Sequence, residues 1–498
     1  MAANGTFRRL VGIAALTGAA IGGSALVRRR ETRPEVRHGV HLVHRRHRTA
    51  EMARVGGRVG RRYAVHRARK VFAGAERREV LDREFELRTA ADVTSALGNM
   101  KGALMKLGQM ASYLDDGLPE PVREALASLQ SNAPPMSPDL AAEAVERELG
   151  LPPDRLFEEW DEVPIAAASI GQVHRAITRD GRPVAVKVQY PGVDRAIRAD
   201  LDNSDLLFNA LGLIHPGFEA GPVIDELRGR IVEELDYERE ARNQRLFADY
   251  YDGHPFIHVP KVIDELCTAR VLTTELASGA RLAEVLEWTP HEKTLAAETI
   301  YRFVFRSIYQ LHAFNGDPHP GNYLFAPGGR VTFLDFGLVK TWDRVDIEIF
   351  EDMVKTIALD HDGAAFKAVI ERANILKPGS GMGEDEVFEY FGQFYLPVLE
   401  DAPFTFTHEF ARKTVQRLLL SEGTVAKYGN VPPNAVIIQR INVGLYSILA
   451  DLEATANWRR IAEELWPFTD GPPSTALGEE EQRWLRSRGR ARSVPGVE

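Results

Sequence analysis

Hydrophobic residues follow a helical period in the first third of the chain. Between residues 93 and 114 they recur at steps of three and four, at Val93, Leu97, Met100, Leu104, Leu107, Ala111 and Leu114. This spacing puts them on one face of a helix about six turns long. Turn residues at 117–119 and 133–137 bracket a second helical piece, and Ser137-Pro138-Asp139 has the composition of a helix start.

The pattern changes to short apolar runs from Val163 onward. Residues 165–177 and 183–190 form two such runs, and Asp180-Gly181 between them is a hairpin turn signal. The remaining pattern predicts further strands at 271–276, 323–325 and 331–336, a long charged helix at 223–250, and mostly helical sequence up to about residue 466. A small sheet with one key helix, followed by a larger helical part, is typical of an α+β fold.

Composition is that of a folded protein. The chain has 498 residues, of which 44% are hydrophobic and 27% charged, so it can bury substantial cores and is neither disordered nor fibrous. Its one cysteine, Cys267, excludes an internal disulfide framework and a thiolate metal cluster. We expect Cys267 to be a small buried hydrophobe in a reducing, intracellular setting. The tail from Asp470, with Gly471-Pro472-Pro473 and an arginine-rich end, predicts disorder.

Positive charge is concentrated near the N-terminus. Residues 1–78 carry 19 Lys and Arg against 4 Asp and Glu, a balance of +15, which leaves −24 for the rest of a chain whose total is −9. Such an arm either binds phosphates of lipid headgroups or nucleic acid, or stays solvated, and we expect a membrane surface rather than nucleic acid. The uncharged residues 10–27 predict a weak membrane anchor or a surface helix, with a secretory signal as the competing interpretation.

Three polar residues have a spacing suited to phosphoryl transfer. Asp317 is followed by Asn322 five positions later, and Asp335 of the tripeptide DFG comes thirteen positions after that. In protein kinases an Asp of the catalytic loop faces the acceptor, an Asn holds a metal ion, and the Asp of DFG binds the metals on the phosphates. DFG alone is a common tripeptide, but the three in order predict Asp317 as a catalytic residue and Asn322 and Asp335 as Mg²⁺ ligands.

An upstream strand supplies a cation for a nucleotide. Residues 184–187 (VAVK) alternate as a strand does, and Lys187 corresponds to the kinase lysine that contacts the α- and β-phosphates. Its partner should be a glutamate on the following helix. Charge pairing alone cannot choose among the acids found there, which are Glu233, Glu234, Asp236, Glu238 and Glu240.

Six short segments occur in a fixed order between about residues 90 and 465. They are residues 106–109 (KLGQ), 166–174 (AAASIGQVH), 184–187 (VAVK), 234–236 (ELD), 317–322 (DPHPGN) and 335–337 (DFG). This set resembles the ABC1/UbiB (AarF/ADCK) family of atypical kinases, to which the KxGQ element and the alanine-rich loop are peculiar. The resemblance implies a bilobal protein-kinase-like fold with a small β-sheet N-lobe, a helical C-lobe and an N-terminal helical KxGQ extension. It also implies that Glu240 is the catalytic ion-pair partner of Lys187.

An alanine-rich loop takes the place of the glycine-rich loop that covers ATP in ordinary kinases. We expect the cofactor-binding residues to be Lys187, the hinge from Glu275 to Ala277, and the loop residues Ala166, Ala167, Ala168, Ser169, Ile170, Gly171, Gln172 and Val173. Alanine adds methyl groups and removes the positive φ that glycine allows. ATP or ADP would still bind, but transfer to a protein hydroxyl would be disfavoured. This agrees with the weak or absent protein-kinase activity that the resemblance implies.

The KxGQ element supplies predicted regulatory residues. In the family it folds over the kinase cleft and its lysine meets an acidic ExD pair, so the resemblance assigns this role to Lys106 and Gln109 with Glu234 and Asp236. On an ideal helix Glu234 and Asp236 project about 200° apart. Both can therefore reach Lys106 only if the helix is distorted there or begins between them.

These expectations divide the chain into six parts. They are 1–30, a membrane anchor or surface helix; 31–90, a basic helical lead-in; 91–150, the KxGQ extension; 151–277, the N-lobe; 278–466, the C-lobe; and 467–498, a disordered tail.

The function expected from these parts is that of an atypical kinase or ATPase that binds ATP and Mg²⁺. It would act on an isoprenoid lipid or quinone precursor at the cytoplasmic side of a membrane, peripherally or through a weak anchor, and the lipid follows from the resemblance alone. The alternative is a nucleotide-gated binding module, a pseudokinase with little turnover, against which the intact Asp317 argues. A Ser/Thr protein kinase is disfavoured because Asn315-Gly316 replaces the usual His-Arg and no Ala-Pro-Glu-like anchor follows Gly337. A homodimer is a further hypothesis.

Overall fold

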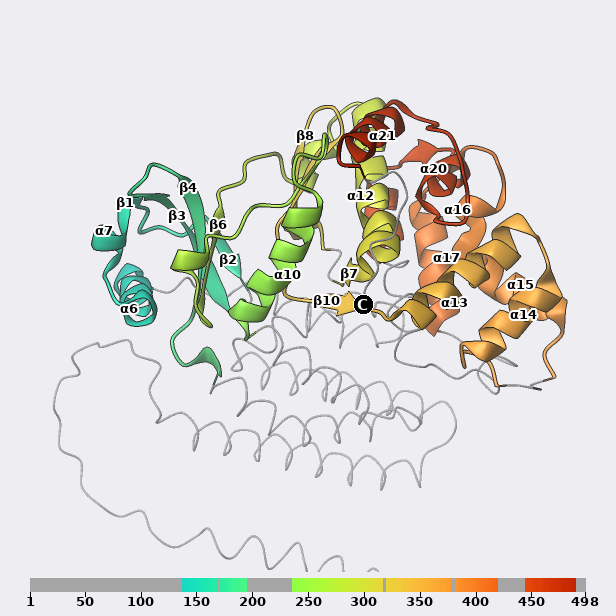
Figure 1. Cartoon of the computed structure of the whole chain (residues 1–498), viewed down its shortest axis with the longest axis horizontal. Coiled ribbons are helices and arrows are strands. Elements are labelled where there is room, and N and C mark those ends of the chain that lie inside the picture. Colours follow the sequence, from blue (N-terminus) through green and yellow to red (C-terminus); the bar gives the residue numbers. More distant parts are fainter. Residues whose placement is uncertain are drawn as a thin grey trace, which may run out of the picture. The chain divides into compact units, whose positions relative to one another are not determined.

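The predicted strand, turn, strand unit forms the centre of a five-stranded antiparallel sheet (Figure 1). Its strands are β1 (Phe157–Trp160), β2 (Ala166–Ala168), β3 (Gly171–Thr178), β4 (Pro183–Gln189) and β6 (Val271–Glu275), in the order β1-β3-β4-β6 with β2 paired to β3. Gly181 has φ 81° in the hairpin turn, a left-handed conformation that glycine adopts readily. The computed structural model describes residues 137–168, 170–194, 235–316, 319–377, 379, 381–419 and 444–489.

Helices cover both faces of this sheet. They are α6 (Pro138–Leu149), followed by the short α7 (Pro153–Leu156), and α10 (Tyr237–Tyr250). Val184, Val186 and Val188 of β4 are fully buried in one cluster with α6. Because side chains alternate along a strand, Lys187 projects from the opposite face, where α10 lies. The predicted start of α6 is confirmed, with Ser137 as N-cap and a proline in the first turn.

The charged helix begins later than its sequence pattern predicts. We expected one helix over 223–250, but Leu235 and Asp236 are not helical and α10 begins at Tyr237. The Asp236 side chain is the N-cap and accepts a hydrogen bond of 2.9 Å from the Arg239 backbone N–H. The prediction of an uninterrupted helix through this point was therefore wrong. Asp236 precedes the helix, and Glu234 lies outside the described residues.

The chain after β6 is largely helical, as predicted. Its helices are α11 (Leu282–Val285), α12 (Pro290–Leu311), α13 (Arg344–Val354), the π-helix Lys355–Leu359, α14 (Gly363–Arg372), α15 (Glu384–Gly392), α16 (Leu396–Leu399), α17 (His408–Leu419), α20 (Trp458–Leu465) and α21 (Ala476–Ser487). Short 3₁₀ turns in this part are η2 (Pro320–Asn322) and η4 (Gln393–Tyr395), while η1 (Asp264–Leu266) precedes β6. Most of α12 is buried in the main hydrophobic cluster, so this helix forms the centre of the helical part.

Three small sheets accompany these helices. They are β5-β9-β8, formed by Ile257–His258, Arg330–Phe333 and Tyr323–Ala326; β10-β7, formed by Val339–Thr341 and Ala313–Asn315; and β11-β12, formed by Phe404–Thr405 and Thr455–Ala456. The strands predicted at 323–325 and 331–336 are thus present as β8 and β9. Together they make a hairpin that carries the candidate site described below.

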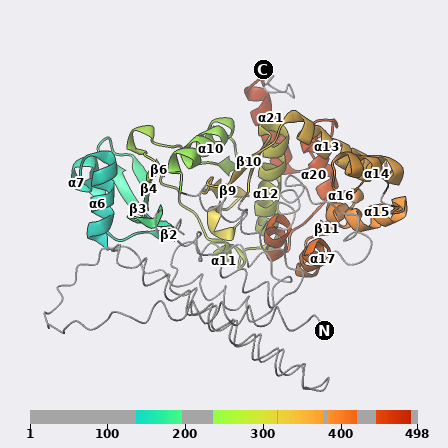
Figure 2. The same ribbon diagram turned by 90° about the horizontal axis from the view of Figure 1, so that it is seen from below.

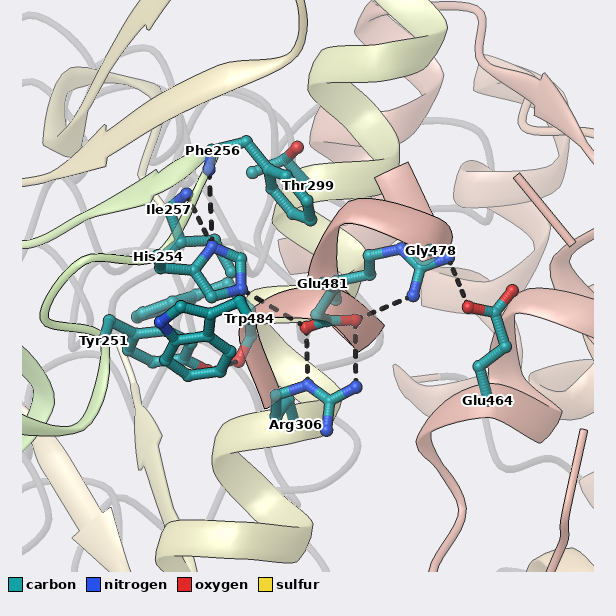
Figure 3. Close-up of polar contacts among 12 residues, drawn as sticks. Tyr251, His254, Phe256, Ile257, Thr299, Arg306, Glu464, Gly478, Glu481 and Trp484 are labelled. Atoms are coloured by element: carbon teal, nitrogen blue, oxygen red, sulfur yellow. Dashed lines mark hydrogen bonds and ion pairs between the residues drawn. The ribbon is translucent and has the colours of Figure 1, made fainter. Parts of the chain in front are cut away.

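The C-terminal tail is not disordered over 476–487, which corrects the sequence prediction. These residues form α21, which lies against α12 in both views (Figures 1 and 2). Glu481 is 1% exposed and lies between Arg306 of α12 and His254 (Figure 3). Trp484 is buried, and its indole N–H donates to the Asp252 carbonyl. Gly471-Pro472-Pro473 and the arginine-rich end predicted disorder, whereas α21 is held against α12 by the buried, paired carboxylate of Glu481.

No helix of the described residues is long and apolar enough to span a membrane. The predicted anchor at 10–27, the basic lead-in and the KxGQ helix lie outside the part of the chain that the structure describes.

Candidate functional site

Lys187 and Glu240 form a buried ion pair between β4 and α10. The lysine Nζ lies 2.7 Å from Glu240 Oε1 and donates a second hydrogen bond of 2.9 Å to Oε2. The Glu240 side chain is 4% exposed and the Lys187 side chain 19%. Glu240 lies in the first turn of α10, where the helix dipole stabilises a carboxylate. The strand and the helix therefore hold an ammonium group in a partly water-excluded place.

The charge of Lys187 is maintained by its carboxylate neighbours. Burial alone would lower the pKa of Lys187, but the negative charges of Glu240 and Asp335 outweigh burial and raise this pKa well above its usual value. The Asp335 Oδ2 atom lies 3.9 Å from the lysine Nζ. The lysine Nζ also lies over the Tyr237 ring, 5.0 Å from the ring centroid. At neutral pH the side chain thus stays a cation that could contact an anionic ligand.

The hairpin of β8 and β9 brings Asn322 and Asp335 together. Tyr323 of β8 pairs with Phe333 of β9, so the residue before β8 and the residues after β9 lie at the same end of the hairpin. The Leu334 N–H donates to the Asn322 carbonyl over 3.0 Å. The hairpin therefore brings the backbone of Asn322 close to that of Leu334, the residue before Asp335, although Asn322 and Asp335 are thirteen positions apart in the sequence.

The donor set matches a small hard cation. Carboxylate and amide oxygens are ligands that Mg²⁺ accepts, and this ion usually takes one or two protein carboxylates together with substrate phosphates. Among the described residues, no group of three or more His, Cys, Asp and Glu could hold a metal ion by itself. Asp335 and Asn322 could therefore hold Mg²⁺ together with phosphate oxygens of a bound nucleotide.

The alanine-rich loop comprises strand β2 and the start of β3, which pair as a hairpin. Ala166 pairs with Val173, Ala167 with Gln172, and Ala168 with Gly171, while Ser169 lies outside the described residues. Among the loop residues that are described, Ala167 is exposed, Ala166, Ala168 and Val173 are half-buried, and Ile170, Gly171 and Gln172 are buried.

The buried part of this loop is in contact with the sheet rather than open to a ligand. Gln172 is hydrogen-bonded to the His174 ring over 2.8 Å. A Cβ on Gly171 would come 2.2 Å from the Val188 carbonyl oxygen, so glycine is required for the close approach of β3 and β4. Among the described residues of this loop, the side chains with exposed surface are therefore those of Ala166, Ala167, Ala168 and Val173.

The predicted hinge lies at the end of β6. Glu275 is its last residue; its N–H donates to the Lys261 carbonyl, and its carboxylate accepts from the Lys261 N–H. The Leu276 N–H donates to the Pro183 carbonyl, and Ala277 is half-buried. The backbone of this segment is thus hydrogen-bonded to Lys261 and to the first residue of β4.

Some predicted site residues cannot be placed. Asp317, Ser169, Glu234, Lys106 and Gln109 lie outside the described residues. Asp317 falls in the short stretch between β7 and η2, and Asp236 is the N-cap of α10, 3.9 Å from Arg242.

Two residues that sequence reasoning did not single out contact the DFG segment from α10. The Arg239 guanidinium donates to the Gly337 carbonyl and the Asn243 amide donates to the Phe336 carbonyl, each over 2.9 Å. Arg239 and Asn243 are four residues apart, and Glu240 directly follows Arg239. A helical projection of residues 237–250 would therefore have shown Arg239 and Asn243 on one face of the helix.

The chain is similar to a known domain family and to several known proteins. Residues 128–369 match the ABC1 atypical kinase-like domain. The chain is 32% identical over 271 residues to the mitochondrial atypical kinase COQ8B of Rattus norvegicus, which covers 54% of this chain and 51% of that protein. It is 28% identical over 386 residues to the mitochondrial atypical kinase coq-8 of Caenorhabditis elegans. The aligned region covers 75% of this chain and 50% of that protein. The chain spans about half the length of these curated relatives.

A solved structure is similar over nearly its whole length. It is the complex of Rv3197 with erythromycin from Mycobacterium tuberculosis, with 31% identity, a TM-score of 0.57 and coverage of 78% of this chain and 98% of that chain. The α+β kinase-like fold expected from the sequence is thereby confirmed, as is the family. The chain belongs to the ABC1 atypical kinase-like family.

Proposed function

We propose that the protein is an atypical kinase-like enzyme that binds ATP with Mg²⁺ and acts as an ATPase or a small-molecule kinase. The observation that carries this proposal is the set of Lys187, Glu240 and Asp335, in which the buried carboxylate of Glu240 and the half-buried one of Asp335 hold one ammonium charged. Such a set matches the phosphate clamp of kinases. A solvated surface pair would need neither the burial nor the second carboxylate.

Each residue has a role in this proposal. Lys187 would contact the nucleotide phosphates, Glu240 would keep its ammonium in position, and Asn322 and Asp335 would hold Mg²⁺. The ion, when bound, supplies positive charge that neutralises the phosphates. Asp317, by its place in the sequence, would accept a proton from the acceptor or orient a water molecule. Adenine would lie along the backbone at Glu275 to Ala277.

The acceptor is proposed from the family rather than from these residues. Relatives named mitochondrial atypical kinases COQ8B and coq-8 support a role in quinone metabolism, with an isoprenoid lipid or quinone precursor at a membrane surface. We propose that Ala166 to Ala168 disfavour protein acceptors, because their methyl groups and lost φ freedom alter the cover over the γ-phosphate. The two-lobed arrangement, and a KxGQ helix whose Lys106 and Gln109 meet Glu234 and Asp236 over the cleft, belong to the same proposal.

The second candidate is a nucleotide-gated binding module. The burial of Gly171 and Gln172 against the sheet is compatible with this candidate, because a rigid hairpin suits a stable nucleotide complex as well as it suits turnover. In this case nucleotide binding would persist and phosphate release would stay at background. The two candidates therefore differ in turnover and agree in binding.

Equilibrium binding of ATP in the presence of Mg²⁺ tests the part that both candidates share. Lys187→Met should weaken binding by about tenfold or more, the size expected for loss of a charge-assisted hydrogen bond. Lys261→Met is the matched control, since the Lys261 side chain is 59% exposed. Equal affinity of wild type and Lys187→Met would contradict the proposed clamp, and thermal unfolding without nucleotide checks that the variant is folded.

A further inference from the structure

Every carbonyl of the DFG segment accepts a hydrogen bond from a different side chain. The three contacts are Asn315 Nδ2 to Asp335 O at 2.5 Å, Asn243 Nδ2 to Phe336 O at 2.9 Å, and Arg239 Nη2 to Gly337 O at 2.9 Å. Consecutive carbonyls in a loop usually bond to backbone or water. Side-chain donors on all three mean that this backbone conformation is selected by tertiary contacts.

Two of the donors come from α10, the helix that also carries Glu240. Arg239, Asn243 and Phe247 follow one another at steps of four, so they line one face of the helix. Phe247 packs on the buried Phe336 ring with centroids 4.9 Å apart. The same helix face thus holds the DFG segment by its ring and by two of its carbonyls.

The third donor comes from the strand that leads into the catalytic stretch. Asn315 is the last residue of β7 and pairs with Val339 of β10, just after the DFG segment. The Gly316 N–H donates to the Leu338 carbonyl over 2.6 Å. The segment is therefore held from the helix on one side and from β7 on the other.

This backbone arrangement determines where the Asp335 carboxylate lies. Its Oδ1 atom accepts a hydrogen bond of 2.9 Å from the Gly337 N–H, while Oδ2 lies 3.9 Å from the Lys187 Nζ. If the Gly337 backbone moved, the bond to Oδ1 would break and the carboxylate could rotate. Gly337 also lies beside Glu240, whose Oε2 would be 3.8 Å from an added Cβ.

We propose that Arg239 and Asn243 are positioning residues that hold Asp335 in its metal-binding orientation. Through these hydrogen bonds the position of α10, and with it the Lys187 and Glu240 pair, depends on the DFG backbone. The position of the DFG backbone depends in turn on α10. This inference rests on the proposed function, because it concerns how Mg²⁺ and nucleotide bind together. Neither residue touches the nucleotide phosphates in this scheme; both act through the backbone at 336–337.

The test measures ADP affinity of the full chain with and without Mg²⁺ and takes the ratio as the metal-dependent gain. Asn243→Leu removes the donor at similar side-chain size, and Arg239→Gln removes the other donor independently. Each should reduce the gain by about fivefold to tenfold, the effect of one lost hydrogen bond, with metal-free affinity unchanged. Higher Mg²⁺ concentration should restore binding. Leu246→Gln is the control, since Leu246 is 41% exposed on the same helix.

The outcomes separate this inference from the proposed function. A purely structural role would lower the unfolding temperature of both variants and leave their metal-dependent gain equal to that of wild type, which would overturn the inference alone. If wild type itself shows no metal-dependent gain, the proposed function fails and the inference with it. A reduced gain in either folded variant, restored by excess Mg²⁺ and absent from Leu246→Gln, would support it.

Discussion

Neutralising Glu481 should destabilise the protein through the buried contacts of α21. Its carboxylate accepts hydrogen bonds from Arg306 Nε at 2.5 Å, from Arg306 Nη2 at 2.9 Å and from Arg302 Nη1 at 2.9 Å. Arg302 is fully buried and Arg306 nearly so. Burial alone would raise the pKa of Glu481, but the two guanidinium groups outweigh burial and hold this pKa well below its usual value.

The size of the effect follows from which charges lose their partner. Glu481→Gln keeps the shape and one oxygen acceptor but leaves two buried cations facing a neutral group. Removing one partner of a buried pair typically costs about 3–5 kcal/mol. Arg302 keeps Glu298 at 2.7 Å and Glu464 at 2.9 Å. We therefore expect the lower end of that range, about 3 kcal/mol in the free energy of unfolding.

Urea unfolding of the full chain measures this loss. Glu479→Gln is the matched control, because it makes the same chemical change on the same helix at a side chain that is 65% exposed and 4.0 Å from Arg483. A surface pair of this kind is worth less than about 1 kcal/mol. If Glu481→Gln were no less stable than Glu479→Gln, the buried network would not be what anchors α21.

Three further predictions concern pH, packing and thiol chemistry. Burial lowers the pKa of His254, so the unfolded chain binds a proton at this imidazole more tightly than the folded protein does. The free energy of unfolding should therefore fall as pH drops below about 6.5, and His254→Asn should reduce this pH dependence in urea titrations. An unchanged pH dependence in His254→Asn would contradict this. Gly171→Ala should cost about 1–3 kcal/mol or more, because its Cβ would meet the Val188 carbonyl at 2.2 Å, and an unshifted unfolding midpoint would refute the clash. Cys267 should react with a thiol reagent slowly in the native protein and quickly in urea, since burial raises its pKa and its thiol donates to a carbonyl; equal rates would exclude a protected thiol.

The sheet could be predicted from the sequence because its signals are local. Alternation on either side of Asp180-Gly181 gives β3 and β4, and the same alternation puts Lys187 opposite a valine-lined face. The spacing of Asn322 and Asp335 could also be interpreted, since an antiparallel hairpin brings its two ends together. In both cases the interacting groups are close in sequence, or their positions follow from the alternation of side chains along a strand.

The rest depended on contacts between distant residues. Charge alone could not select Glu240 among five acids, and only the family resemblance did so; the start of α10 at Tyr237 decides which acids face β4. The tail was interpreted as disordered from its Gly-Pro-Pro run and arginine-rich end, because the arginine partners of Glu481 lie 175 and more residues away and give no local signal. Arg239 and Asn243 went unnoticed for the same reason, as their acceptors are backbone carbonyls nearly a hundred positions on.

The most direct test of the proposed function is steady-state phosphate release from Mg-ATP by the purified full chain, with and without liposomes that contain isoprenoid lipid. We expect release that rises with these liposomes and falls by about a hundredfold or more in Asp317→Asn, the loss typical of a removed catalytic acid or base. Asp335→Asn should also be inactive, while Asp385→Asn, an exposed change on α15, should match wild type. Tight nucleotide binding with release no higher than in Asp317→Asn would contradict an enzyme and leave the nucleotide-gated binding module.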